Sequence, residues 1–106
     1  MIISTTNEVA AHRVVRTLGL VRGNTIRARH VGRDLKAFGR SLVGGEISEY
    51  TKLMAEAREQ ALDRMVEQAT ELGANAILGT RFATSMVMSG GAELLAFGTA
   101  VVVEAE

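Results

Sequence analysis

The stretch EYTKLMAEAREQALDRMVEQATELGANA, residues 49–76, decides the fold of this chain. Its apolar residues recur at three- and four-residue steps, which is the pattern of an amphipathic helix. Gly73 follows as a left-handed cap, and Gly73-Ala74-Asn75-Ala76 closes the helix and opens an apolar segment. We therefore predict one long helix over residues 49–72, whose apolar stripe consists of Tyr50, Leu53, Met54, Ala57, Ala61, Met65, Ala69 and Leu72.

Two apolar runs follow the helix, residues 75–88 and 94–103, and they bracket Ser89-Gly90-Gly91-Ala92. A glycine-containing connection between two such runs predicts an antiparallel hairpin. In the second run, alternate residues from Leu95 to Val103 lie on one face, and the other face is also apolar. One helical layer covers only one face of a sheet, so the second face favours association between subunits.

The part of the chain before the helix predicts strands and a short helix. Residues 13–29 read as extended, with Val14, Leu18 and Leu20 on one strand face and a turn or bulge signal at Gly23-Asn24. Residues 33–43 have helical periodicity and a basic stripe, and Gly44-Gly45 ends them. The chain is thus predicted to be one α+β domain, residues 1–106, with a small antiparallel sheet, one long helix and one short helix.

Composition excludes several classes of protein. There is no Cys, which rules out disulfides, thiolate metal ligands, iron–sulfur clusters and cysteine nucleophiles. The N-terminus has no basic region followed by an apolar one, and no apolar stretch reaches the ~20 residues of a membrane span. We therefore expect a cytoplasmic protein without a membrane partner.

The net charge is zero, but basic and acidic residues are unevenly distributed along the chain. Residues 1–47 carry eight Lys and Arg against three acids, whereas residues 48–106 carry four against nine, so the halves are +5 and −5. We expect these halves to face each other within or between subunits. Nucleic acid is not an expected partner, because no aromatic residues are interleaved to stack on bases within the basic band of Arg27, Arg29, Arg33, Lys36 and Arg40.

Several short motifs, taken in order, make the chain resemble the YbjQ-like family over essentially its whole length. Two small departures are Ala11, where a Gly is familiar, and Ser48, where a Pro is familiar. The motifs are Gly32-Arg33-Asp34, Gly44-Gly45-Glu46, Glu49-Tyr50-Thr51, Arg58 with Ala61, Gly73-Ala74-Asn75-Ala76, Arg81-Phe82, and Glu93 with Gly98-Thr99-Ala100-Val101.

The resemblance implies a dodecin-like α+β subunit that assembles as a homopentamer, either one ring or a pair of rings forming a decamer. Strands that carry apolar residues on both faces agree with such an assembly. The family is labelled as heavy-metal-binding, but it is uncharacterised, and the resemblance carries no established active-site residues over to this chain.

The metal label fits these residues poorly. Soft metals prefer thiolate and thioether ligands, and zinc prefers Cys and His at close spacing. His12 has Glu8 four residues earlier and His30 has Asp34 four residues later, so each pair would form a half-site only in a helix. Neither segment reads as helical. A metal at His12 or His30 is therefore a hypothesis that the ligand spacing does not support, and the cofactor stays unknown.

The remaining candidates are charged residues that border glycine turns and apolar strands. Such groups are expected to be partly buried and paired, as ion pairs across subunits or as contacts to a small ligand. The ligand-binding candidates are Arg33, Asp34, Glu46, Arg81 and Glu93.

Three functions remain open. The leading hypothesis is a non-enzymatic ring that binds a small ligand or ion at clefts between subunits. The alternative is a structural or interaction module that presents an acidic helix face, Glu59, Asp63 and Glu67, to a partner protein. An enzyme built at a subunit interface comes third, and no catalytic residue is assigned.

Overall fold

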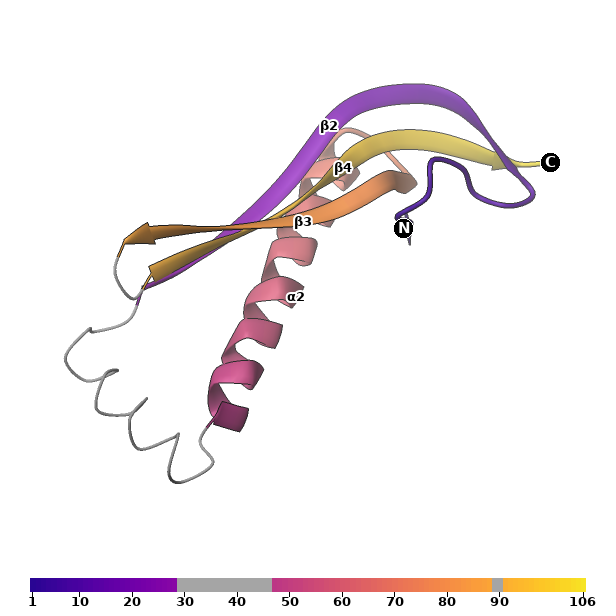
Figure 1. Cartoon of the computed structure of the whole chain (residues 1–106). Helices are drawn as coiled ribbons and strands as arrows, with labels where there is room; N and C mark the ends of the chain where they lie inside the picture. Colours follow the sequence, from indigo (N-terminus) through magenta and orange to yellow (C-terminus); the bar gives the residue numbers. More distant parts are fainter. Residues whose placement is uncertain (29–46, 89–90) are drawn as a thin grey trace.

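The computed structural model describes residues 1–28, 47–88 and 91–106. In chain order they form β1 (Ile2–Ile3), β2 (His12–Ala28), α2 (Ile47–Glu71), β3 (Ala76–Met88) and β4 (Gly91–Ala105) (Figure 1). The predicted α+β class and long helix are confirmed. The short helix predicted over residues 33–43 lies outside the described residues.

The strands form one four-stranded sheet in the order β1-β3-β4-β2. β3 and β4 pair in antiparallel fashion, as the hairpin prediction requires, and β2 is antiparallel to the other side of β4. β1, however, runs parallel to β3 through Ile2 and Ile3. The prediction of a purely antiparallel sheet is therefore wrong, because a two-residue strand leaves no periodic signal in the sequence.

Helix α2 packs across β2 and β4 on one face of the sheet (Figure 1). Ala57, Ala61, Met65 and Ala69 are fully buried in this contact. Three of the four are alanines, so the helix backbone lies close to the strands. The outer side of α2 is charged. No helix among the described residues is long and apolar enough to cross a membrane.

Gly23 is the point of closest approach between β2 and α2. A Cβ atom at this position would overlap the carbonyl oxygen of Ala61 and the backbone nitrogen of Met65. Nearby, the hydroxyl of Thr25 donates a hydrogen bond of 3.1 Å to the carbonyl of Ala57. The strand runs through Gly23 without a register shift, so the predicted turn is wrong: this glycine makes room for the helix.

The irregularities of β2 lie earlier in the strand. Its register against β4 shifts between Val14 and Arg16 and again between Thr17 and Gly19. As a result Leu18 packs against the helix-side core, whereas Leu20 is 63% exposed on the opposite face. The predicted common face for Leu18 and Leu20 is therefore wrong, because a bulge adds a residue and changes the alternation.

We call the face of the sheet opposite α2 the far face, and the described residues cover it only at one end. There Ile2 and Val9 of the N-terminal segment pack on a second apolar cluster. This cluster is formed by residues of β3 and β4, namely Ala76, Leu78, Val101 and Val103. The alternation predicted for β4 is confirmed, since Ala96 and Ala100 belong instead to the core beneath α2.

Ala11 joins the N-terminal segment to β2 in a left-handed conformation, with φ of 60°. Its carbonyl accepts a hydrogen bond of 2.9 Å from the backbone N–H of Glu106, which ties this turn to the end of the chain. A residue with a Cβ is disfavoured in this conformation by roughly 1–2 kcal/mol. Ala11 is also one of the two departures of this chain from the pattern of the family that it resembles, in which a glycine is familiar at this position.

Replacing Ala11 by glycine should therefore stabilise the protein. Relief of the left-handed strain exceeds the added chain entropy of glycine, so we expect Ala11→Gly to raise the free energy of unfolding by roughly 0.5–1 kcal/mol. Urea unfolding at fixed protein concentration measures the effect. Ala10→Gly is the matched control and should lower stability, and a loss of stability in Ala11→Gly would contradict the assigned strain.

Candidate functional site

The far face carries a row of two cations and an aromatic ring. Arg81 on β3 lies opposite Phe97 on β4, and Phe97 lies opposite Arg22 on β2. Residues directly opposite each other in neighbouring strands share a face, so these three side chains form one row across the sheet. Arg22 and Arg81 are exposed and Phe97 is half-buried. Such a row offers positive charge and a flat apolar surface to a ligand.

Arg81 also holds the N-terminal segment in place. Its Nη1 donates to the carbonyl oxygen of Thr5 and to that of Thr80, each at 2.8 Å. In the single subunit Arg81 is exposed and its described partners are carbonyl groups, so its expected burial and ion pairing across subunits stay a prediction. This residue therefore has a structural role that is independent of any ligand.

Glu93 lies on the same face in a different row. It is half-buried in the single subunit and lies opposite Ile26 and Ser85. Its Oε2 accepts a hydrogen bond of 3.4 Å from Nδ2 of Asn24. Four residues of β4 separate Glu93 from the row of Arg81, which is about 13 Å along a strand. One subunit therefore does not bring Arg81 and Glu93 together around a small ligand.

His12, the described metal candidate, begins β2 and lies in no helix. Its Nδ1 is 2.8 Å from the carbonyl oxygen of Ala10, and the side chain of Glu8 is exposed. Within residues 1–28, 47–88 and 91–106, no group of three or more His, Asp or Glu side chains is placed to hold a metal ion. The other candidates, His30, Arg33, Asp34 and Glu46, lie outside the described residues.

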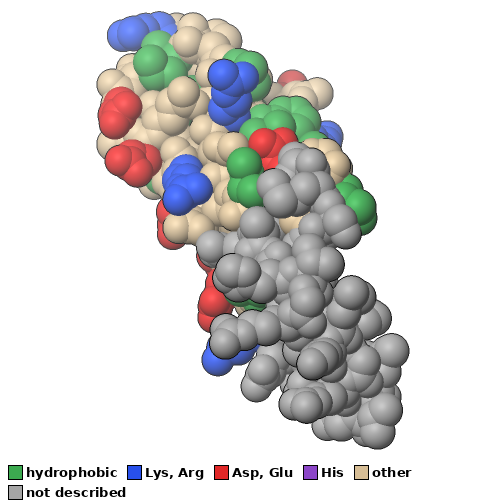
Figure 2. Space-filling model, turned by 90° about the vertical axis from the view of Figure 1, so that its left-hand side faces the viewer, with side chains coloured by type: hydrophobic (Ala, Val, Ile, Leu, Met, Phe, Trp, Pro, Cys, Tyr) green, Lys and Arg blue, Asp and Glu red, His purple; other side chains and the backbone are tan. Residues whose placement is uncertain are grey.

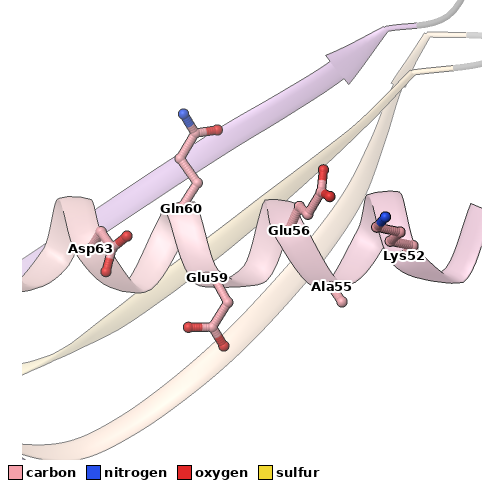
Figure 3. A pocket seen from close by; sticks show the side chains of 6 residues that line it. All are labelled: Lys52, Ala55, Glu56, Glu59, Gln60 and Asp63. Atoms are coloured by element: carbon pink, nitrogen blue, oxygen red, sulfur yellow. The ribbon is translucent and has the colours of Figure 1, made fainter.

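The outer face of α2 carries an acidic ridge, which we define as Glu59, Asp63 and Glu67. All three side chains are exposed. An open depression of about 580 Å³ borders this face, and its described lining comes from α2 alone (Figure 3). The lining residues are Lys52, Ala55, Glu56, Glu59, Gln60 and Asp63.

The described residues show no ion pair to the ridge, and Arg64, the cation next to Asp63 in the sequence, is bonded elsewhere. Arg64 donates from Nη1 to the carbonyl oxygen of Asn24 on β2. In the part of the chain that the structure describes, one ion pair joins the basic and acidic halves, Arg13 with Glu104 at 3.2 Å. Both side chains are more than half exposed, so this pair contributes little to stability. Although basic and acidic residues are equal in number, most of them form no ion pair within the described part of the subunit. Figure 2 shows basic, acidic and hydrophobic side chains close together on one surface.

The exposure of β3 was not anticipated from the sequence. Residues 81–86 are all exposed, including the apolar side chains of Phe82 (45%) and Met86 (82%). Helix α2 lies over β2 and β4 and reaches only the start of β3, where Ile77 is buried, so the described residues leave residues 81–86 uncovered on both faces. A signal was present in the sequence, since residues 82–88 form a strand without a charged residue. Whether such a strand is buried or exposed depends on where α2 lies.

Comparison with known proteins gives relatives along the whole chain. A family described as "Putative heavy-metal-binding", YbjQ-like, matches residues 1–104. A UPF0145 protein of Dehalococcoides mccartyi is 55% identical over 104 residues, which cover 98% of this chain and 100% of that protein. A UPF0145 protein of Pyrococcus abyssi is 52% identical over 106 residues, covering 100% of this chain and 93% of the relative.

A solved structure supports the fold. A protein of unknown function from Pediococcus pentosaceus, assigned to the DUF74 family, superposes with a TM-score of 0.66 and covers 98% of both chains. Its sequence identity is 15%, so the likeness concerns the fold alone. The match over residues 1–104 and the relatives at more than 50% identity lead to one conclusion: this chain belongs to the YbjQ-like (UPF0145) family.

Proposed function

We propose that the protein is a cytoplasmic, ring-forming homo-oligomer, a pentamer or a pair of pentameric rings, that binds a small ligand or ion at clefts between its subunits. The observation that carries this proposal is the uncovered surface of the sheet. Beyond the N-terminal segment, the far face exposes Leu20 (63%) and Ile26 (52%) beside the half-buried Leu95 and Phe97. Apolar side chains gathered on one sheet face favour burial against another layer, at about 25 cal/mol per Å².

The position of the charged candidates supports a cleft between subunits. Arg81 and Glu93 lie on the same face, in rows that are about 13 Å apart. A small ligand would contact both kinds of group only where a second subunit supplies one of them. Glu93 is half-buried and is bonded to the neutral Asn24, and its described contacts include no cation. It is therefore available to a cation or to a donor group of a ligand.

Native mass spectrometry of untagged protein, purified without chelators, tests both parts of the proposal. We expect an assembly of five or ten subunits of 11.3 kDa that retains one adduct per subunit. Glu93→Gln should reduce the retained adduct at least ~10-fold, because the charged group that contacts the ligand is lost. Glu104→Gln is the control, since Glu104 lies in a surface ion pair, and it should leave the adduct in place.

The outcomes separate the two parts. A monomer at all concentrations would contradict the ring and leave the exposed apolar residues without a cover. An assembly that retains no adduct, or one whose adduct survives in Glu93→Gln, would contradict this ligand site while keeping the ring.

The second candidate function is an interaction module, and the unpaired acidic ridge on α2 favours it. Like charges at i, i+4 spacing repel by a few tenths of a kcal/mol per pair, so the ridge costs stability unless a basic surface covers it. In this role the ring would present the ridge to a partner protein, and the charge at Glu93 would be irrelevant.

Charge reversal of the ridge distinguishes the two functions. If the interaction module is correct, the triple variant Glu59→Lys, Asp63→Lys, Glu67→Lys should lose a partner that copurifies with the wild-type protein at stoichiometric amounts. Its assembly mass should stay unchanged, and Glu93→Gln should keep the partner. Retention of the same partner by the reversed ridge would contradict this role.

A further inference from the structure

The outer edge of β3 is covered at its start and open beyond. The backbone N–H groups of Gly79 and Thr80 donate to the carbonyls of Thr6 and Ser4, each at 2.9 Å. From residue 81 onward no described strand pairs with this edge. As far as the described residues show, the edge therefore becomes free where the N-terminal segment leaves it.

The register fixes which backbone groups are free. The N–H of Thr80 points away from β4, and successive residues of a strand alternate in direction. The N–H and C=O groups of Phe82, Thr84 and Met86 therefore point outward, while those of Arg81, Ala83 and Ser85 face β4. The side chains of the outward-pointing residues lie on the same face as α2, with Thr84 opposite the buried Leu94.

The other edge of the sheet is blocked by the protein itself. On the outer side of β2, the N–H of Arg22 donates to Oε1 of Gln68 at 2.7 Å, and the carbonyl of Asn24 accepts from Arg64. Two register shifts also interrupt this strand. Side-chain caps and bulges are the devices that prevent strands from pairing between molecules.

Residues 82–86 of the β3 edge have neither a described side-chain cap nor a bulge. They contain no charge and no proline, and the two register shifts of β3 against β4 lie on either side of them, between Leu78 and Arg81 and between Met86 and Met88. An exposed, uncharged strand edge such as residues 82–86 is a site of aggregation unless another strand covers it. The chain blunts one edge and leaves the other open, which indicates that the open edge has a regular occupant.

We propose that this occupant is the same strand of a second copy, paired antiparallel about a two-fold axis at Thr84. In this register Thr84 lies opposite the partner subunit's Thr84, and Phe82 lies opposite the partner subunit's Met86. About six backbone hydrogen bonds form. Thr–Thr pairs and contacts between a thioether and an aromatic ring are both favourable, and no like charges oppose each other within residues 82–86.

This pairing rests on the self-association proposed above, but it requires neither a ligand nor a closed ring. A two-fold contact is isologous, whereas a five-membered ring needs a heterologous one. The contact between the β3 strands of two copies, which we call the β3 joint, would therefore connect two rings face to face. It predicts an even number of subunits.

The variant Thr84→Pro tests the joint directly. Proline at this position removes an outward N–H and leaves the ladder to β4 intact, whereas Thr84→Ala keeps the N–H and is the matched control. Light scattering coupled to size-exclusion chromatography should show the wild-type mass halved in Thr84→Pro and unchanged in Thr84→Ala. A wild-type mass retained by Thr84→Pro overturns the joint but not self-association, whereas a monomeric wild type overturns both.

A crosslinking experiment decides the question should Thr84→Pro fail to fold. The chain has no cysteine, so Thr84→Cys introduces a single thiol. Opposite residues of a hydrogen-bonded pair have Cα atoms about 5.5 Å apart, within the range of a disulfide. Mild oxidation should convert Thr84→Cys to a covalent dimer at least ~10-fold faster than Thr51→Cys, an exposed position on α2. Equal rates overturn the proposal.

Discussion

The close contact of α2 with β2 at Gly23 is the constraint on which the rest of the structure depends. Because no Cβ is present there, the backbones of Ala61 and Met65 lie almost against the strand. The same contact is held by Thr25 and by the small buried residues of α2. Because α2 is fixed over β2 and β4, it covers only the start of β3, where Ile77 is buried, and leaves residues 81–86 exposed. Among the described residues, no helix lies on the far face.

The distribution of charged side chains also follows from the position of α2 over β2 and β4. With its inner stripe used for packing, α2 carries its acids outward, and Arg64 and Gln68 are drawn to the edge of β2 instead of to the ridge. One element thus covers one face of the sheet, caps one edge and presents negative charge to its surroundings. The described residues leave most of the opposite edge and of the opposite face open, and these are the surfaces through which we propose that the protein assembles.

Local sequence patterns predicted the helices and strands well, but they predicted poorly how these elements pair and pack. The apolar stripe predicted a helix over residues 49–72, and α2 spans Ile47–Glu71. The left-handed cap at Gly73, with φ of 88°, was also foreseen. The bulges of β2, however, depend on its pairing with β4, and the role of Gly23 depends on Ala61 and Met65, which lie 38 and 42 residues later in the chain. Neither is a local property.

The candidate site was predictable only as a set of residue types. The sequence singled out Arg81 and Glu93 by their position beside apolar strands, and the sheet does place both on the far face. Their separation into different rows follows from register, and the bonds of Arg81 to Thr5 and Thr80 follow from the path of the N-terminal segment. The open edge of β3 was invisible for the same reason, because exposure is set by what α2 does not cover.

The central claim, that the open edge of β3 is covered by a second copy, is tested most directly by residue-resolved amide hydrogen exchange on the assembled protein. Our account predicts that the outward amides of Phe82, Thr84 and Met86 exchange as slowly as the inward amides of Ala83 and Ser85, at least ~100-fold slower than unprotected amides. Dilution to dissociated subunits should release only the outward set. Fast exchange of the outward amides in the assembled protein, beside protected inward ones, would contradict the account.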